Sequence, residues 1–80
     1  MQRQELVEQI NATLMEHFEL SPDKLKPEAH IIDELQLDSL DAVDMLVHLE
    51  DKLGKKLDVE KLRDARTLND IYNLVEETLK

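Results

Sequence analysis

The 80 residues leave room for one domain, and the 41% apolar fraction is enough for a folded core. The 19 acidic residues outnumber the 10 basic ones, so the formal net charge is −9. This balance argues against nucleic acid and anionic membranes as partners, since both need a clustered basic face. No cysteine, signal-peptide pattern or long apolar stretch is present. We therefore expect a soluble, cytoplasmic domain with no disulfide and no membrane insertion.

Apolar residues recur at helical intervals, whereas the β-branched clusters typical of strands are missing from the sequence. Residues 3–17 are predicted to form an amphipathic helix on this spacing. Pro22 ends the pattern, because proline disfavours helix at the residue before it. Residues 21–38 are predicted to be mostly loop. Four apolar residues are expected to hold this loop against the core: Leu25, Ile31, Ile32 and Leu35.

The clearest helix is predicted over residues 39–53. Asp38 is a suitable N-cap, and Asp41 three residues later fits a capping-box pattern. Gly54 is the expected C-terminal stop. The predicted buried stripe of this helix consists of Leu40, Val43, Leu46, Val47 and Leu53.

A short helix is predicted at about residues 58–64, and a last helix at 68–79, with Thr67 as its cap and Asp70 at its third position. The inward residues of the last helix are expected to be Leu68, Ile71, Val75 and Leu79. The predicted fold is therefore all-α. It is a small four-helix bundle of three main helices and one short one, a single domain over residues 1–80, with a long loop between the first two helices.

Charge is distributed unevenly along the chain. Residues 27–51 contain no Lys or Arg and eight acids: Glu28, Asp33, Glu34, Asp38, Asp41, Asp44, Glu50 and Asp51. From residue 52 to residue 66 the balance reverses, with six basic residues against three acids. The acidic stretch fits a solvated face that keeps the protein soluble, and it fits equally a docking strip for basic partners.

Nothing in the spacing supports catalysis or a metal site. His17, His30 and His48 belong to separate predicted elements and share no ligand spacing, and the helical ones are expected to be partly exposed. The first glycine is Gly54, which excludes a glycine-rich phosphate loop and an EF-hand before it. Paired carboxylates would need a pocket that separates their pKa values, and a bundle this small offers little room for one.

Ser39 stands in the tripeptide Asp38-Ser39-Leu40 at the start of the acidic helix. As the first helical residue it is expected to have its hydroxyl near solvent. A phosphate attached there would lie beside backbone N–H groups that have no helical partner. The other interpretation is that Ser39 only assists in capping.

Residues 35–51, with Asp38-Ser39-Leu40 near their start and regular acids after it, resemble the attachment-site helix of acyl carrier proteins. The resemblance extends over the whole chain in length, acidity and order of elements. It implies a carrier and not an enzyme. In that family a phosphopantetheinyl transferase moves 4′-phosphopantetheine from coenzyme A onto the serine of the motif.

The resemblance also implies roles for individual residues. Ser39 would hold the cofactor through a phosphodiester, with Asp38 beside it. Partner enzymes that transfer or extend acyl groups would meet the helix with basic docking patches, at Leu40, Asp41, Asp44, Glu50 and Asp51. The residues expected to line an acyl pocket are Val43, Val47, Leu57, Leu62, Ala65 and Ile71. A plain core role for these six residues stays open.

The resemblance implies partner enzymes of fatty-acid, polyketide-like or specialised lipid biosynthesis. Two departures from the family pattern favour a specialised pathway, polyketide-like, lipid-modifying or another secondary route, over bulk fatty-acid synthesis. Gln36 occupies a place that is often glycine, and residues 52–66 are more basic than is usual. Asp38 also argues against a peptidyl carrier, which usually has glycine before the serine. The alternative functions are an acidic helical interaction module without a prosthetic group, and a small hydrolase using Ser39. We expect a monomer.

Overall fold

The computed structural model describes residues 2–79 of the chain. It contains the helices α1 (Arg3–Phe18), α2 (Ser39–Leu53), α3 (Val59–Asp64) and α4 (Leu68–Leu79), and a short 3-10 helix, η1 (Pro22–Lys24). No strand forms within this part of the chain, so the all-α bundle is confirmed. The predicted bounds of all four helices agree with the structure to within one residue, whereas η1 was not predicted.

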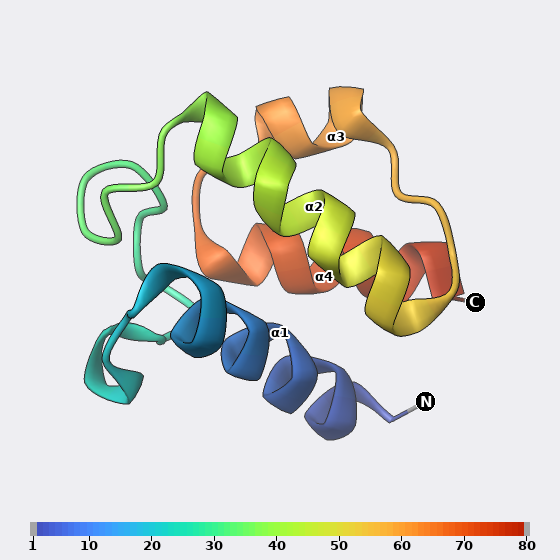
Figure 1. Cartoon of the computed structure of the whole chain (residues 1–80), viewed down its shortest axis with the longest axis horizontal. Coiled ribbons are helices and arrows are strands. Elements are labelled where there is room, and N and C mark those ends of the chain that lie inside the picture. The colour runs from blue at the N-terminus through green and yellow to red at the C-terminus, as the bar shows by residue number, and fades with distance from the viewer. Residues whose placement is uncertain (1, 80) are drawn as a thin grey trace.

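Each helix packs against two others. Helix α1 packs against α2 and α4, and α3 packs against the same two helices α2 and α4 from another side. Figure 1 shows α2 lying across α4, with the long loop between α1 and α2 at one end of the bundle. Among the residues described, no helix combines the length and the apolar character needed to cross a bilayer.

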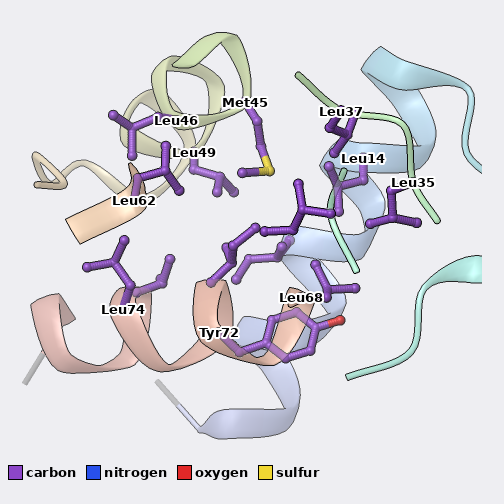
Figure 2. Close-up of a cluster of buried hydrophobic side chains, with 14 of the residues drawn as sticks. Leu14, Leu35, Leu37, Met45, Leu46, Leu49, Leu62, Leu68, Tyr72 and Leu74 are labelled. Carbon is purple, nitrogen blue, oxygen red and sulfur yellow. The ribbon is translucent and has the colours of Figure 1, made fainter. Parts of the chain in front are cut away.

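A core rich in leucine fills the space between α1, α2 and α4, and it includes loop residues Leu35 and Leu37 (Figure 2). Helix α2 contributes Met45, Leu46 and Leu49 to this core. The predicted stripe of α2 was therefore largely wrong. Leu46 is buried, but Leu53 is only partly buried, and Leu40, Val43 and Val47 are exposed.

The error has a simple cause. Helix α2 has apolar residues on two faces, and Val43/Val47 and Met45/Leu49 are both spaced four apart. Helical periodicity shows that each pair shares a face, but it cannot show which face meets the core.

Backbone hydrogen bonds hold the long loop against the start of α4. The Ile31 N–H donates to the Arg66 carbonyl (2.9 Å), and the Leu68 N–H donates to the Ala29 carbonyl (3.0 Å). The Asn69 N–H donates to a third loop carbonyl, that of Pro27 (2.9 Å). The chain between α1 and α2 is therefore an ordered part of the fold.

Side chains along this loop alternate between core and solvent. Leu25, Ile31 and Leu35 are buried as predicted, together with Ala29 and Leu37, whereas Ile32 is 71% exposed, against prediction. The turn at residues 31–35 is closed by the Leu35 N–H, which donates to the His30 carbonyl (3.0 Å).

Gln36 has a left-handed backbone, with φ at 57°. This turn allows Leu35 and Leu37 on either side of it to be buried, and the Leu37 N–H then donates to the Ile31 carbonyl (3.0 Å). The position thus uses the backbone region that glycine adopts most readily. Gly54 shows the same conformation (φ 70°) where it ends α2.

Thr67 and Asp70 cap the start of α4 as predicted. The Asp70 carboxylate accepts from the N–H groups of Arg66 (3.0 Å) and Thr67 (3.2 Å), and the Asp70 N–H donates to the Thr67 hydroxyl (3.4 Å). These two backbone donors lower the pKa of Asp70 below its ordinary value, because they favour the charged carboxylate.

Asp70→Asn should therefore lower the free energy of unfolding at pH 7 by about 1 kcal/mol. Because the folded pKa is depressed, the charge stabilises the fold above the unfolded value of about 3.9 and is lost as the pH falls through the folded pKa. Urea unfolding at several pH values checks this, with Glu77→Gln on the same helix as control. A difference between wild type and Asp70→Asn that stays constant down to pH 2 would contradict the capping role.

Gln36→Gly should raise the free energy of unfolding by about 0.5 kcal/mol. A left-handed backbone costs a residue with a side chain about 1–2 kcal/mol, which outweighs the entropic cost of glycine, about 0.5–1 kcal/mol. Gln36→Ala keeps the Cβ and should bring no such gain. A glycine variant less stable than the alanine variant in urea unfolding would contradict this expectation, because the entropic cost of glycine would then exceed the backbone strain that it relieves.

Candidate functional site

The start of α2 is held by a reciprocal capping box, as predicted. The Asp41 N–H donates to the Asp38 carboxylate (2.9 Å), and the Asp38 N–H donates to the Asp41 carboxylate (3.4 Å). Ser39 follows the cap as the first residue of the helix. The Ser39 side chain lies outside the described part of the structure, so the expected exposure of its hydroxyl stays a prediction.

An apolar pocket of about 320 Å³ lies beside this helix start and is partly open to solvent. Its volume is at the lower end of the range of small-molecule sites, roughly 300–1,000 Å³. The walls come from the loop before α2, from the first turns of α2, and from α3 with the residue after it. The lining residues are Ile31, Ile32, Leu37, Asp38, Leu40, Ala42, Val43, Val59, Leu62, Arg63 and Ala65.

Half of the predicted acyl-pocket residues line this pocket, namely Val43, Leu62 and Ala65. The other three, Val47, Leu57 and Ile71, are not part of its walls, and their role in an acyl pocket stays a prediction. Val47 is farther along α2 with half of its surface exposed. Leu57 follows the opposite end of α2, and Ile71 is buried in the core on α4.

Two pocket residues on α3, Val59 and Arg63, were missed. Val59, Leu62 and Arg63 are spaced three and four apart and therefore share one face of the helix. That spacing could have identified them. The loop residues Ile31, Ile32 and Leu37 could not be placed in this way, because their position depends on the backbone bonds to α4.

Exposed apolar side chains gather around the pocket. Within residues 2–79 the large exposed ones are Ile32, Leu40, Val43, Val47 and Val59. All of these except Val47 line the pocket, and Leu40, directly after Ser39, is 79% exposed. Apolar patches on a small soluble domain commonly mark interaction sites.

The acids predicted to dock partners differ in their surroundings. Asp38, Asp44 and Asp51 are exposed and Asp41 is half-buried. Glu50 is also half-buried, and its carboxylate accepts from the Leu57 N–H (2.8 Å). This bond holds the segment between α2 and α3, a structural role that sequence reasoning missed. Glu50 is therefore not one of the exposed acids of α2.

The structure brings together two histidines that the sequence keeps apart. The rings of His17 on α1 and His48 on α2 stack with centroids 3.7 Å apart and planes inclined by 10°. The Nε2 atom of His48 also lies 3.6 Å from the Asp44 carboxylate. Even so, no group of three or more His, Cys, Asp or Glu side chains in the described chain is arranged to hold a metal ion.

Comparison with known proteins gives a consistent result. The family described as "Phosphopantetheine attachment site" matches residues 4–75. "Acyl carrier protein 2" of Ralstonia nicotianae is 35% identical over 79 residues, which cover 99% of this chain and 98% of the relative. The acyl carrier protein of Thermosynechococcus vestitus is 28% identical over 94% of this chain and 93% of its own.

The fold also has a solved counterpart. The crystal structure of an acyl carrier protein from Thermotoga maritima superposes with a TM-score of 0.83, at 23% identity, over 99% of this chain and 92% of the other. At that identity the superposition supports the fold alone. The family match and the relatives named as carriers, taken with the Asp38-Ser39-Leu40 motif at a capped helix start, lead to one conclusion: the chain belongs to the acyl carrier proteins, which are phosphopantetheine-bearing carriers and not enzymes.

Proposed function

We propose that Ser39 carries the 4′-phosphopantetheine and that the chain delivers acyl groups to partner enzymes as thioesters. The observation behind this proposal is the place of Ser39 in the fold. It is the first residue of α2, and its neighbours Asp38 and Leu40 both line the apolar pocket. An arm attached at this residue would therefore begin at the edge of that pocket.

The surroundings of Ser39 fit a phosphodiester. The N–H groups in the first turn of a helix have no partner within the helix, and the helix dipole makes this end favourable for an anion. The capping box uses the N–H of Asp41 and leaves that of Leu40 at the start of α2. When bound, the cofactor supplies a thiol that holds the acyl group as a thioester.

Loading would proceed by transfer of one group to the Ser39 oxygen. In a transferase active site, the Ser39 oxygen attacks the coenzyme A phosphorus that carries the pantetheine. A new P–O bond forms at Ser39, the pyrophosphate link breaks, and adenosine 3′,5′-bisphosphate leaves. The hydroxyl proton passes to a base of the transferase. The chain itself only has to present the serine.

The outer face of α2 has the properties of a docking surface. It combines the exposed acids Asp38, Asp44 and Asp51 with the exposed Leu40. Acids of this kind attract basic patches at long range, and an apolar side chain such as Leu40 adds contact area once the partner is in place. The phosphopantetheinyl transferase and the acyl-transferring or chain-extending enzymes would bind here.

The pocket is the proposed shelter for the acyl chain. Its apolar walls, including Val43, Leu62 and Ala65, would shield the chain, and its opening to solvent would permit release. A volume of about 320 Å³ holds roughly ten groups the size of a water molecule, taking about 30 Å³ for each. We therefore expect short or medium acyl chains to fit better than long ones.

The proposal includes a specialised pathway, with the basic residues of 52–66 as its support. It also includes a monomeric carrier. The cytoplasm is proposed as its location, since the sequence has no cysteine for the disulfides common in oxidising compartments. The family match concerns the attachment site of a prosthetic group, so it does not favour the alternative of an interaction module without one.

Incubation with coenzyme A and a broad-specificity phosphopantetheinyl transferase should add one phosphopantetheinyl group to the protein. Ser39→Ala should abolish the gain, and Ser21→Ala, which removes the only other serine, should leave it intact. Intact mass spectrometry measures the addition. No gain on wild-type protein that is helical by circular dichroism would contradict the carrier role of Ser39 and favour the interaction module.

Neutralising the outer acids should slow this loading. The double variant Asp44→Asn and Asp51→Asn should lower kcat/KM about fivefold, and the loss should shrink at high salt, because exposed charge pairs are modest and screened. The matched control removes two exposed acids elsewhere, by Glu16→Gln and Glu77→Gln. An equal loss in the control would mean that net charge alone, not the face of α2, guides the transferase.

A further inference from the structure

The pocket beside Ser39 has two charged residues in an otherwise apolar wall, Asp38 and Arg63. Asp38 is already engaged, because its carboxylate caps α2 by accepting from the Asp41 N–H (2.9 Å). The carboxylate is thus turned to the helix that it starts. Arg63 is the positive charge at this pocket.

Arg63 differs from an arginine with a structural role. The Arg3 guanidinium donates to Glu76 (3.2 Å) and Asn69 (3.0 Å) and lies over the ring of Tyr72. Within the described chain, no ion pair or hydrogen bond engages the Arg63 guanidinium, and its side chain is exposed. Its charge is therefore available to a ligand in the pocket.

The chemistry of Arg63 suits an anion at the edge of an apolar cavity. The aliphatic stem of an arginine packs against apolar surface, while its planar head offers several N–H donors in a fixed fork. A carboxylate matches that fork with two parallel hydrogen bonds.

We propose that Arg63 selects acyl groups that carry a carboxylate, so that the preferred cargo is a short dicarboxylic acyl chain attached through one of its two ends. The apolar walls would hold the methylene groups and Arg63 the free carboxylate. This inference rests on the proposed function and specifies its substrate class. The other anion that could lie near Arg63 is the phosphodiester of the arm itself, and the test distinguishes it from the carboxylate.

The test uses three forms of the full chain, loaded by a broad-specificity transferase from coenzyme A, hexanoyl-coenzyme A and adipyl-coenzyme A. The two acyl groups have the same number of carbons and differ in a terminal methyl or carboxylate. The readouts are the NMR signal of the Arg63 Nε–H group, assigned by its loss in Arg63→Gln, and the Tm of each form. Arg66→Gln is the matched control, since Arg66 is exposed and is not part of the pocket wall.

The adipyl form should shift the Arg63 signal relative to the hexanoyl form and raise the Tm by about 4 °C above it. Arg66→Gln should keep this difference in Tm, and Arg63→Gln should lose it. If Arg63→Gln does not fold, Arg63→Lys assigns the Nε–H signal in its place, and the NMR comparison of the two acyl forms of wild type then decides.

Equal Arg63 signals in the hexanoyl and adipyl forms would overturn the proposal and leave Arg63 as a solvated cation. A full shift already present after loading from coenzyme A alone would also overturn it, because the phosphodiester of the arm would then be the ligand. Failure to load from any of the three donors is a separate result. It would overturn the role of Ser39, and the inference about Arg63 with it.

Discussion

The site depends on three backbone hydrogen bonds between the long loop and the start of α4, made by Ile31, Leu68 and Asn69. The loop has little regular structure of its own, and long loops of this kind are uncommon in compact domains unless they serve a function. By pairing with residues 66–69, the loop is brought beside the end of α3. The loop wall of the pocket thereby faces the wall formed by α3, which lies about thirty residues away in the sequence.

The bounds of the helices could be predicted because the signals that set them are local. Asp38 and Asp41 start α2 and Gly54 ends it, each within one turn of the boundary. The face of α2 that meets the core could not be predicted. Val43 and Val47 have the same spacing as Met45 and Leu49, and only the packing of α1 and α4 decides which pair is buried. The stacking of His17 on His48 was missed for the same reason, since it exists only where two helices meet.

The site was predicted unevenly for related physical reasons. Local sequence was sufficient to place Ser39 at the first position of a capped helix. The pocket was only half identified, because its walls combine α2 and α3 with a loop whose path is set by tertiary bonds. Glu50 was assigned to the docking surface because it matches an acidic position of the family, whereas in the structure its carboxylate accepts from the Leu57 backbone. Charge in a sequence shows where an acid is, but not whether the fold already uses it.

The loop and α4 are joined through backbone atoms, which every residue except proline supplies in full. The side chains that face the pocket from the loop and from α3, such as Ile32 and Arg63, are exposed and are not needed to hold this frame together. Their identities can therefore drift in evolution, or be exchanged by design, at little cost to folding. A single scaffold could be retuned for new cargo by changes at the rim, while the face of α2 that we propose for partners stays the same.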